Sequence, residues 1–440
     1  MTPVEADIIS LLKKEVKPAL GCTEPIAVAL STAKAVEIME EKCPGCCTAG
    51  WRLAADFSIR VEVSGNILKN GMGVGIPGTG MIGLYIAAAL GAVCGKSEYA
   101  LEVLHDLEPG AIARAKELVE RKKISINIAD TTRKLYVKAY VSTGDGHESS
   151  ALIEDDHDNI VETCFDGSIL HSGHAQAKDE ESAGMTGRDI TVKEIFSFTE
   201  NAAYEDIRFI LESRDLNLAL AQEGLQGDYG LKVGKTIHAA RNREVFGSDF
   251  MSYAMSLTAA ASDARMAGCT LPAMSNSGSG NQGITVTMPV IAYAIKYGTD
   301  EETLARALVL SHLVAIHIKG YLGRLSALCG CVIASTGASC GIVYLRGGNC
   351  GHVCAAIKNM IGNITGMVCD GAKVGCAMKV ASGVSSAIQS AVLALEGTCI
   401  SEHDGIIEKD IEKTIRNLGQ IGSEGMQNTD NMILDIMVCK

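Results

Sequence analysis

The chain has 440 residues, of which 47% are hydrophobic and 21% charged, and this composition excludes global disorder. Acidic residues outnumber basic ones by 52 to 39, the net charge is −13, and aromatic residues make up only 4%. A nucleic-acid-binding surface is therefore not expected, because such surfaces need clustered Lys and Arg and aromatic rings for stacking.

The cysteines and the N-terminal segment indicate a compartment. Residues 1–17 contain no long hydrophobic run and no small-residue cleavage site, so no signal peptide is predicted. Sixteen cysteines in so long a chain do not resemble a small secreted disulfide scaffold, and we expect a cytoplasmic protein. The uncharged stretch 325–345 is long enough to span a bilayer, but it is rich in Ser, Thr, Gly and Cys, which favours a buried segment over a membrane span.

The first 40 residues are predicted to be helical. Thr2-Pro3-Val4-Glu5 offers a cap residue, a proline at the first helical position and a glutamate three residues after the cap. A second helix is expected from about Glu24 to Glu41, and Cys43-Pro44-Gly45-Cys46-Cys47 ends it. No βαβ pattern surrounds this CxxC sequence, so a surface turn is favoured over a thioredoxin-like site.

Residues 50–170 show a mixed pattern. Alternation over 57–63 predicts a strand, the Gly-rich segment 71–80 a turn, and 81–94 and 108–121 two helices. Short alternating runs at 124–128, 134–141, 149–154 and 159–165, with Asp and Gly between them, predict an antiparallel meander. Residues 171–190 are polar and are predicted to form a linker or mobile loop.

From residue 191 onwards the pattern is helical, with long Ala- and Leu-rich segments such as 250–268 and 301–322. The predicted fold class is therefore α+β, a mainly helical domain with an inserted smaller α+β domain that contains an antiparallel sheet. The expected division is 1–48 as N-terminal helices packing with the C-terminal domain, 49–190 as the α+β domain, and 191–440 as the helical domain.

Cysteines and glycines gather near the C-terminal part of the chain. Cys329, Cys331 and Cys340 share one uncharged segment, and Cys369 and Cys376 follow with three glycines close to them. The spacing is neither that of a zinc ribbon nor that of a bacterial ferredoxin. Glycine lets the backbone approach a bulky cofactor, yet on spacing alone the favoured interpretation is thiols that pack small-residue helices.

Three further segments are candidates for binding. Cys22 lies just before a helix start, which suits a nucleophile, a metal ligand or an ordinary turn residue. The segment 275–283, SNSGSGNQG, opens an apolar helix and suits a carboxylate or phosphate, or is a simple capped loop. The segment 73–78 matches GxGxxG, but the preceding strand ends ten residues too early for a dinucleotide fold. Asn66, Lys69 and Asn70 are instead candidates to close over a small polar substrate, and a plain surface loop is the equally favoured alternative. His312 and His317 are expected to be buried and hydrogen-bonded.

Five separated blocks resemble the L-cysteine desulfidase family, which is related to the α-domain of iron–sulfur L-serine dehydratases. They are GCTEPIAVAL at 21–30, SGNILKNGMGVGIPGTG at 64–80, SGSGNQGI at 277–284, IKGYLGRLSALCGC at 318–331 and MVCDGAKVGCAMKVASG at 367–383. The resemblance covers nearly the whole chain. It departs from the dehydratases in the spacing of the last block and at Asn281, where they carry a cysteine.

The resemblance implies an oxygen-sensitive [4Fe–4S] cluster held by three cysteines, namely Cys22, Cys329 and Cys369, with Cys376 and Cys331 in reserve. It implies the β-elimination of L-cysteine to hydrogen sulfide, ammonia and pyruvate, and no pyridoxal phosphate is expected because the cluster is the electrophile. Ser277, Ser279, Asn281 and Gln282 are expected to bind the substrate carboxylate.

Lys373 is the first candidate for the base that removes the Cα proton, ahead of Lys69 and His317, although Lys373 is as well suited to neutralise cluster charge. Two alternatives remain open, an L-serine dehydratase of the same mechanism and a non-enzymatic iron–sulfur redox sensor. The expected partner is a small amino-acid substrate, with neither nucleic acid nor membrane, and a homodimer is left open.

Overall fold

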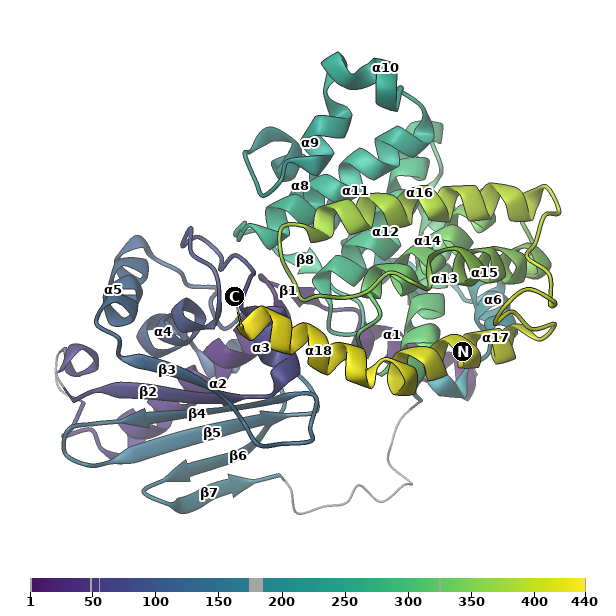
Figure 1. Ribbon diagram of the computed structural model, residues 1–440. Helices are drawn as coiled ribbons and strands as arrows, with labels where there is room; N and C mark the ends of the chain where they lie inside the picture. The colour runs from purple at the N-terminus through teal and green to yellow at the C-terminus, as the bar shows by residue number, and fades with distance from the viewer. Residues whose placement is uncertain (1, 48–49, 55, 174–184, 324–325, 440) are drawn as a thin grey trace.

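The structure, a computed structural model, describes residues 2–439 except 48–49, 55, 174–184 and 324–325. It is mainly helical with one smaller sheet-containing unit, which confirms the α+β fold class (Figure 1). Most of the linker predicted over 171–190 lies outside the described residues.

The larger unit is a body of helices drawn from the N-terminus and the second half of the chain. Its elements are α1 (Pro3–Glu15), α6 (Val192–Asn201), α7 (Tyr204–Ile207), α8 (Glu212–Gln226), α9 (Val233–His238), α10 (Arg243–Phe246), α11 (Phe250–Met266), α12 (Gly280–Tyr297), α13 (Glu301–Leu322), α14 (Gly330–Leu345), α15 (Cys350–Ile364), α16 (Cys376–Leu395), α17 (Ile411–Gln420) and α18 (Gln427–Val438). The predicted capping box at the start of α1 is present, with Thr2 and Glu5 each bonding the other's backbone N–H.

The smaller unit is a sheet covered by helices. Its elements are α2 (Thr23–Lys42), β2 (Ser58–Val63), α3 (Gly65–Gly71), α4 (Leu84–Cys94), α5 (Pro109–Glu120), β3 (Ile124–Ile128), β4 (Tyr136–Ser142), β5 (Glu148–Glu154), β6 (Ile160–Phe165) and β7 (Ser168–Ser172). Two short strands outside this sheet, β1 (Pro18–Ala19) and β8 (Ala273–Met274), pair antiparallel and join the N-terminal segment to the helical body.

The sheet has the order β3-β2-β4-β5-β6-β7 and is mixed rather than wholly antiparallel. The predicted strands β4, β5 and β6 form an antiparallel meander, which β7 extends. The run 124–128 was expected to belong to this meander, but it forms β3, which pairs parallel with β2. The reason is the crossover between them through α3, α4 and α5, since parallel strands need such a connection. The strand β7 was not predicted because its five residues are all exposed and show no alternation.

The helix α2 lies in the core of the sheet unit. Its apolar residues Ile26–Leu30 cluster with strand residues of β2, β4 and β5 and with α4. Ser31 accepts a hydrogen bond from Ala139 N (3.0 Å) and donates one to Ala151 O (2.8 Å), which joins the helix to two strands. Residues 1–48 were expected to pack with the C-terminal domain. The helix α1 does so, whereas α2 packs on the apolar face of the sheet.

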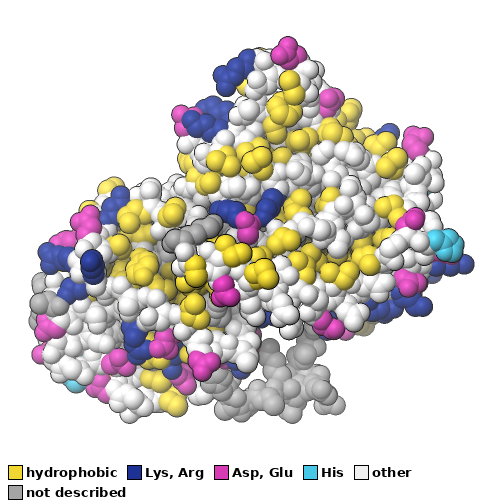
Figure 2. Space-filling model, viewed as in Figure 1, with side chains coloured by type: hydrophobic (Ala, Val, Ile, Leu, Met, Phe, Trp, Pro, Cys, Tyr) yellow, Lys and Arg dark blue, Asp and Glu magenta, His cyan; other side chains and the backbone are white. Residues whose placement is uncertain are grey.

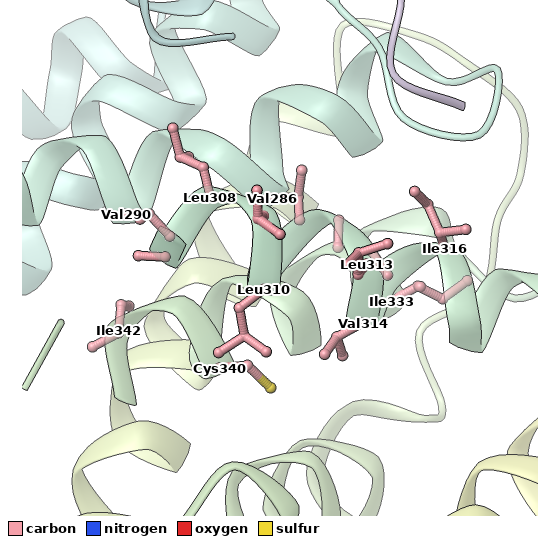
Figure 3. Packing of buried hydrophobic residues seen from close by; sticks show 14 of the residues in the cluster. Val286, Val290, Leu308, Leu310, Leu313, Val314, Ile316, Ile333, Cys340 and Ile342 are labelled. Carbon is pink, nitrogen blue, oxygen red and sulfur yellow. The ribbon is translucent and has the colours of Figure 1, made fainter. Parts of the chain in front are cut away.

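The core of the helical body lies between α12, α13 and α14 (Figure 3). Val286 and Val290 of α12 and Leu310 of α13 are fully buried there. The helices α13 and α14 approach each other closely because α14 has a glycine at the contact. A Cβ on Gly337 of α14 would lie 2.3 Å from Ser311 O of α13. Residues 330–345 of the uncharged stretch noted in the sequence thus form a largely buried helix, α14.

One helix in the described part of the chain, α16, is long and apolar enough to cross a membrane. Half of that stretch is buried inside the structure, and core helices of globular proteins commonly meet the same criterion.

The C-terminal helix α18 lies beside α3, across the junction of the two units (Figure 1). Asn66 donates to Asp430 (2.6 Å), and the buried Lys69 forms an ion pair with the same carboxylate. Figure 2 shows basic and acidic side chains together near the middle of this face, with hydrophobic side chains around them.

Candidate functional site

A cavity of about 120 Å³ lies where the two units meet. Cavities of about 150 Å³ accommodate a molecule the size of benzene, so this space suits a small ligand. Four helices of at least eleven residues direct their N-termini at it: Cys22 precedes α2, Ser279 precedes α12, Cys329 precedes α14 and Cys376 begins α16, and all four residues line the cavity. Free N–H groups and helix dipoles at these ends favour anions, so the cavity is built for negative charge.

Five cysteines line this cavity, none of them in a disulfide. They are Cys22, Cys329, Cys331, Cys369 and Cys376. Burial raises the pKa of Cys329 well above its usual value, and the neighbouring Cys331 and Cys369 raise it further. Burial likewise raises the pKa of Cys331 to about 11 and raises the pKa values of Cys22 and Cys376. These four thiols are thus protonated unless a cation binds them, since a coordinated thiol is deprotonated outright.

Two loop segments bring Cys329 and Cys369 together although 40 positions separate them. The amide of Cys329 donates to Met367 O (3.0 Å), and the amide of Cys369 donates to Ala327 O (2.7 Å). Between these bonds Leu328 and Val368 form an isolated antiparallel bridge. Cys22 reaches the same cavity from α2 and packs in one apolar cluster with Cys376.

Basic side chains flank the thiols. Lys379 lines the cavity and donates to Val368 O (2.8 Å) and to Asp370 Oδ1 (2.5 Å), while Lys373 contacts the same carboxylate. Although burial acts to raise it, these bonds hold the pKa of Asp370 at about 2. Burial acts to lower the pKa of Lys379, but the Asp370 bond and the nearby Asp370, Cys329 and Cys369 together raise it overall, so Lys379 is a positive charge beside the thiols.

Arg265 of α11 is buried and reaches the cavity. Its Nη2 donates to Gly21 O (2.9 Å), whereas its Nε is buried without a partner, as is Oε1 of the neighbouring Gln282. The absence of a side chain at Gly280 makes room for the guanidinium, because a Cβ there would lie 2.2 Å from Arg265 Nε. An unpaired donor on a buried cation costs free energy, so this Nε is a candidate donor to a ligand in the cavity.

The polar loop before α12 is held by buried hydrogen bonds. Asn276 accepts from Gln282 Nε2 (2.7 Å) and donates to Nδ1 of His312 (2.9 Å). Burial lowers the pKa of His312 to about 3, so the ring is neutral and its Nδ1 accepts. Thr23 donates to Gly278 O (2.8 Å), which fixes the start of α2 to the loop.

One acidic side chain in the described residues lines the cavity, Glu24. Its Oε2 accepts from Cys22 Sγ (3.0 Å) and from Thr23 Oγ1 (3.3 Å). Burial acts to raise the pKa of Glu24, but nearby positive charge, chiefly His157, and the Cys22 bond lower it overall. The carboxylate is therefore ionised next to the thiols.

The structure brings together most of the residues that the sequence singled out. The residues that line the cavity are Cys22, Asn70, Ser279, Asn281, Gln282, Cys329, Cys369 and Cys376. The other five lie outside its lining. Ser277 donates to Asn276 within the loop, Asn66 and Lys69 bind Asp430, and Lys373 contacts Asp370. His317 bonds Gly187 O and Glu412, and its burial and that of His312 confirm the expectation for both histidines.

Sequence reasoning missed Arg265, Lys379, Glu24 and Lys319, all of which line the cavity. A signal for Arg265 existed in the sequence. It is a charged residue within 257–266, a helical stretch otherwise almost entirely of Ala, Leu, Ser and Thr. Charged residues inside a buried helix are costly, so their presence there points to a site.

Comparison with known proteins places the chain in a family. The model of the serine dehydratase alpha chain matches residues 98–435. A UPF0597 protein of Bacteroides fragilis is 48% identical over 98% of both chains, and one of Phocaeicola vulgatus is 48% identical over 100% of this chain and 98% of its own. A UPF0597 protein of Porphyromonas gingivalis is 45% identical over 100% and 99%. The chain therefore belongs to the serine dehydratase alpha chain family, a lyase-type enzyme family, and UPF0597 proteins are among its relatives.

Proposed function

We propose that the protein is an iron–sulfur-dependent L-cysteine desulfidase, which eliminates sulfide from L-cysteine. The observation that carries the proposal is the convergence of five free thiols, a buried arginine and four helix N-termini on one cavity. In the balanced reaction the Cα–H and Cβ–S bonds break, hydrogen sulfide leaves, and the resulting 2-aminoacrylate takes up water to give pyruvate and ammonia.

The donor set fits an iron–sulfur cluster. Thiolates are the usual ligands of such clusters, and Cys22, Cys329 and Cys369 would hold this one, with Cys376 and Cys331 nearby. A cluster with three protein ligands supplies a Lewis-acidic iron with an open position when it is bound.

The substrate carboxylate would bind at the start of α12. Arg265 offers an unused Nε donor, and the backbone and side chains of Ser279, Asn281 and Gln282 surround the same end of the cavity. A carboxylate placed there gains a charge-assisted hydrogen bond and the favourable field of the helix.

Two side chains compete for removal of the Cα proton. Glu24 is ionised and faces the thiols, so it is positioned as an acceptor. Lys373, the first candidate from the sequence, has its ammonium against Asp370, which favours a role in balancing negative charge. Glu24→Gln is expected to lower kcat at least 100-fold, and Lys373→Ala less than tenfold. If Lys373→Ala instead lowers kcat more than Glu24→Gln does, Lys373 is the base.

An L-serine dehydratase of the same mechanism is the second candidate, and the matching family description favours it. Asn281 lines the cavity where the dehydratases carry a cysteine, and this difference favours cysteine as the substrate. The test is to reconstitute the protein anaerobically and to measure sulfide and pyruvate from L-cysteine and pyruvate from L-serine. A kcat/KM at least tenfold higher for cysteine supports the proposal, whereas the opposite preference supports the dehydratase.

A redox sensor would carry a cluster but release neither sulfide nor pyruvate from either amino acid. Cys329→Ser is the matched variant for this assay, because it removes one proposed ligand and is expected to abolish both the visible absorbance of the cluster and turnover. Cys399→Ser, which alters an exposed thiol, is expected to leave both unchanged.

A further inference from the structure

A second group of metal-ligand side chains lies far from the cavity along the chain. Cys43 follows α2, Cys46 lies three residues on, and His147 lies in the turn between β4 and β5. One ligand atom from each residue lies within 4.8 Å of the other two, and all three residues are half-buried. Among the residues that the structure describes, this is the one group of three Cys, His or acidic side chains so closely spaced.

His147 is oriented as a ligating histidine is. Its Nδ1 is bonded to Asp166 Oδ2 (2.7 Å), and its ring stacks on Phe165 with centroids 5.6 Å apart. Asp166 is fixed in turn by the amide of Glu148, which donates to Oδ1 (2.9 Å). A carboxylate on one ring nitrogen holds the tautomer in which the other, Nε2, presents its lone pair to a metal.

The two cysteines are positioned by a tight turn. The amide of Cys46 donates to Cys43 O (3.0 Å), and that of Cys47 donates to Pro44 O (3.3 Å). The C-x-x-C spacing presents two sulfurs to one side, as in structural zinc sites. In the structure these two sulfurs are joined in a disulfide, so metal binding requires the reduced form.

We propose that Cys43, Cys46 and His147 form a zinc site in the reduced protein, with Asp166 as the carboxylate behind the histidine. Two molecules of a small thiol reduce the disulfide, become a disulfide themselves, and leave two protein thiols. Binding of Zn²⁺ then releases both thiol protons, and a water molecule or a further protein ligand completes the tetrahedral shell.

The site would join two segments about 100 positions apart. It ties the end of α2 to the hairpin tip of β4 and β5, at the other end of α2 from Cys22 (Figure 1). With 20 residues α2 is roughly 30 Å long, so the zinc site and the cavity would be separate. The proposal therefore does not depend on the proposed lyase activity.

The test measures zinc and iron in the full-length protein. The protein is treated anaerobically with a dithiol, desalted and supplied with Zn²⁺ alone, and zinc and iron are then quantified per chain. One zinc per chain is expected in the wild type. Cys43→Ser, Cys46→Ser and His147→Ala should each lose it while the iron content stays the same, and the matched controls Cys399→Ser and His171→Ala should keep it.

Asp166→Asn adds a milder variant that preserves the ligands. Loss of the carboxylate behind a ligating histidine lowers metal affinity about 10- to 100-fold, and this is the expected weakening in a zinc competition titration. The proposal is overturned if the reduced wild type takes up no zinc, if His147→Ala retains it with unchanged affinity, or if Cys329→Ser rather than Cys43→Ser removes it.

Discussion

Arg265 is a buried charged residue with one hydrogen-bond donor left unpaired. The residue is 3% exposed and its guanidinium bonds Gly21 O, yet its Nε has no partner beside the cavity. A ligand that accepts a hydrogen bond from this donor would offset the free-energy cost of burying the cation. We infer that the start of α12 and this arginine act together as one anion-binding element.

Arg265→Gln is expected to raise KM for the amino acid about 10- to 100-fold. The reason is the loss of one charge-assisted hydrogen bond, worth about 1.5–3 kcal/mol. Steady-state kinetics with L-cysteine measure the effect, and Arg208→Gln, which alters an exposed arginine paired with Glu205, is the control. An unchanged KM in Arg265→Gln would remove the arginine from substrate binding.

Asp263 makes stability depend on pH. Burial raises the pKa of its carboxyl to about 6, against the opposing effect of hydrogen bonds from the backbone at Gly234 and its neighbours. The folded protein thus binds this proton more tightly than the unfolded chain does. The stabilisation is fully present below about pH 4 and is lost as the pH rises through about 6.

Asp263→Asn should therefore remove this contribution to the pH dependence of the free energy of unfolding between about pH 4 and pH 6. The wild type is expected to lose about 3 kcal/mol of unfolding free energy across this window that the variant does not lose, because the pKa of Asp263 is raised from 3.8 to about 6. Urea unfolding at several pH values measures it, with Asp7→Asn on the exposed face of α1 as the control. If both variants follow the wild-type pH profile, a group other than Asp263 determines the pH dependence of stability in this range.

At the scale of elements, the contact between α3 and α18 depends on a buried ion pair. Lys69 is 1% exposed, and its partner in α18 is Asp430, which also accepts from Asn66. Asp430→Ala leaves the lysine buried without an anion, and removing one partner of such a pair costs about 3–5 kcal/mol. The expected result is faster hydrogen exchange in α18 and in α3.

The matched control is Asp435→Ala, which removes an exposed carboxylate from the same helix. It is expected to leave the exchange rates of both helices unchanged. A second variant, Lys69→Met with Asp430→Leu, replaces the pair by apolar side chains and is expected to recover most of the lost stability. Equal exchange in Asp430→Ala and Asp435→Ala would show that the ion pair does not hold α18.

Local pattern predicted the elements better than their pairing. Alternation over 57–63 and over the three strands of the meander gave the strands, and the Thr2 cap gave the start of α1. The parallel pairing of β3 could not be predicted, because it depends on a crossover rather than on any residue of the strand. The exposed β7 and the short α3 lack the apolar periodicity on which such prediction rests.

At the scale of the whole molecule, the site was predictable where residues occur in motifs. Cys22, Cys329 and Cys369 stand in separate blocks of sequence, and all three line the cavity. Arg265 lies in none of the five blocks, and Lys379 was not singled out although it lies in the last block. The packing of α11 and α16 around the loop before α12 brings both residues to the cavity. Sequence spacing along one helix does not show which other helix ends it will face.

The division of the chain also yields a prediction. Because α2 covers the sheet, residues 49–173 expressed alone should expose its apolar face and fail to fold, whereas residues 21–173 should give a cooperative thermal transition. Circular dichroism on heating and the dispersion of amide signals in NMR spectra distinguish the two fragments. A folded 49–173 fragment would contradict the role of α2 in that core.

The helix α2 has one further consequence. Its first turn is held at the cavity by Thr23 and Cys22, and its body is the covering layer of the sheet. A ligand that binds only the folded cavity adds its binding free energy to the stability of the folded state. Because α2 belongs both to the cavity and to the core of the sheet unit, we expect that unit to be stabilised as well. A fluorophore attached near the hairpin of β4 and β5 would therefore report occupancy of the cavity as a change in melting temperature, without contact with the ligand and without turnover.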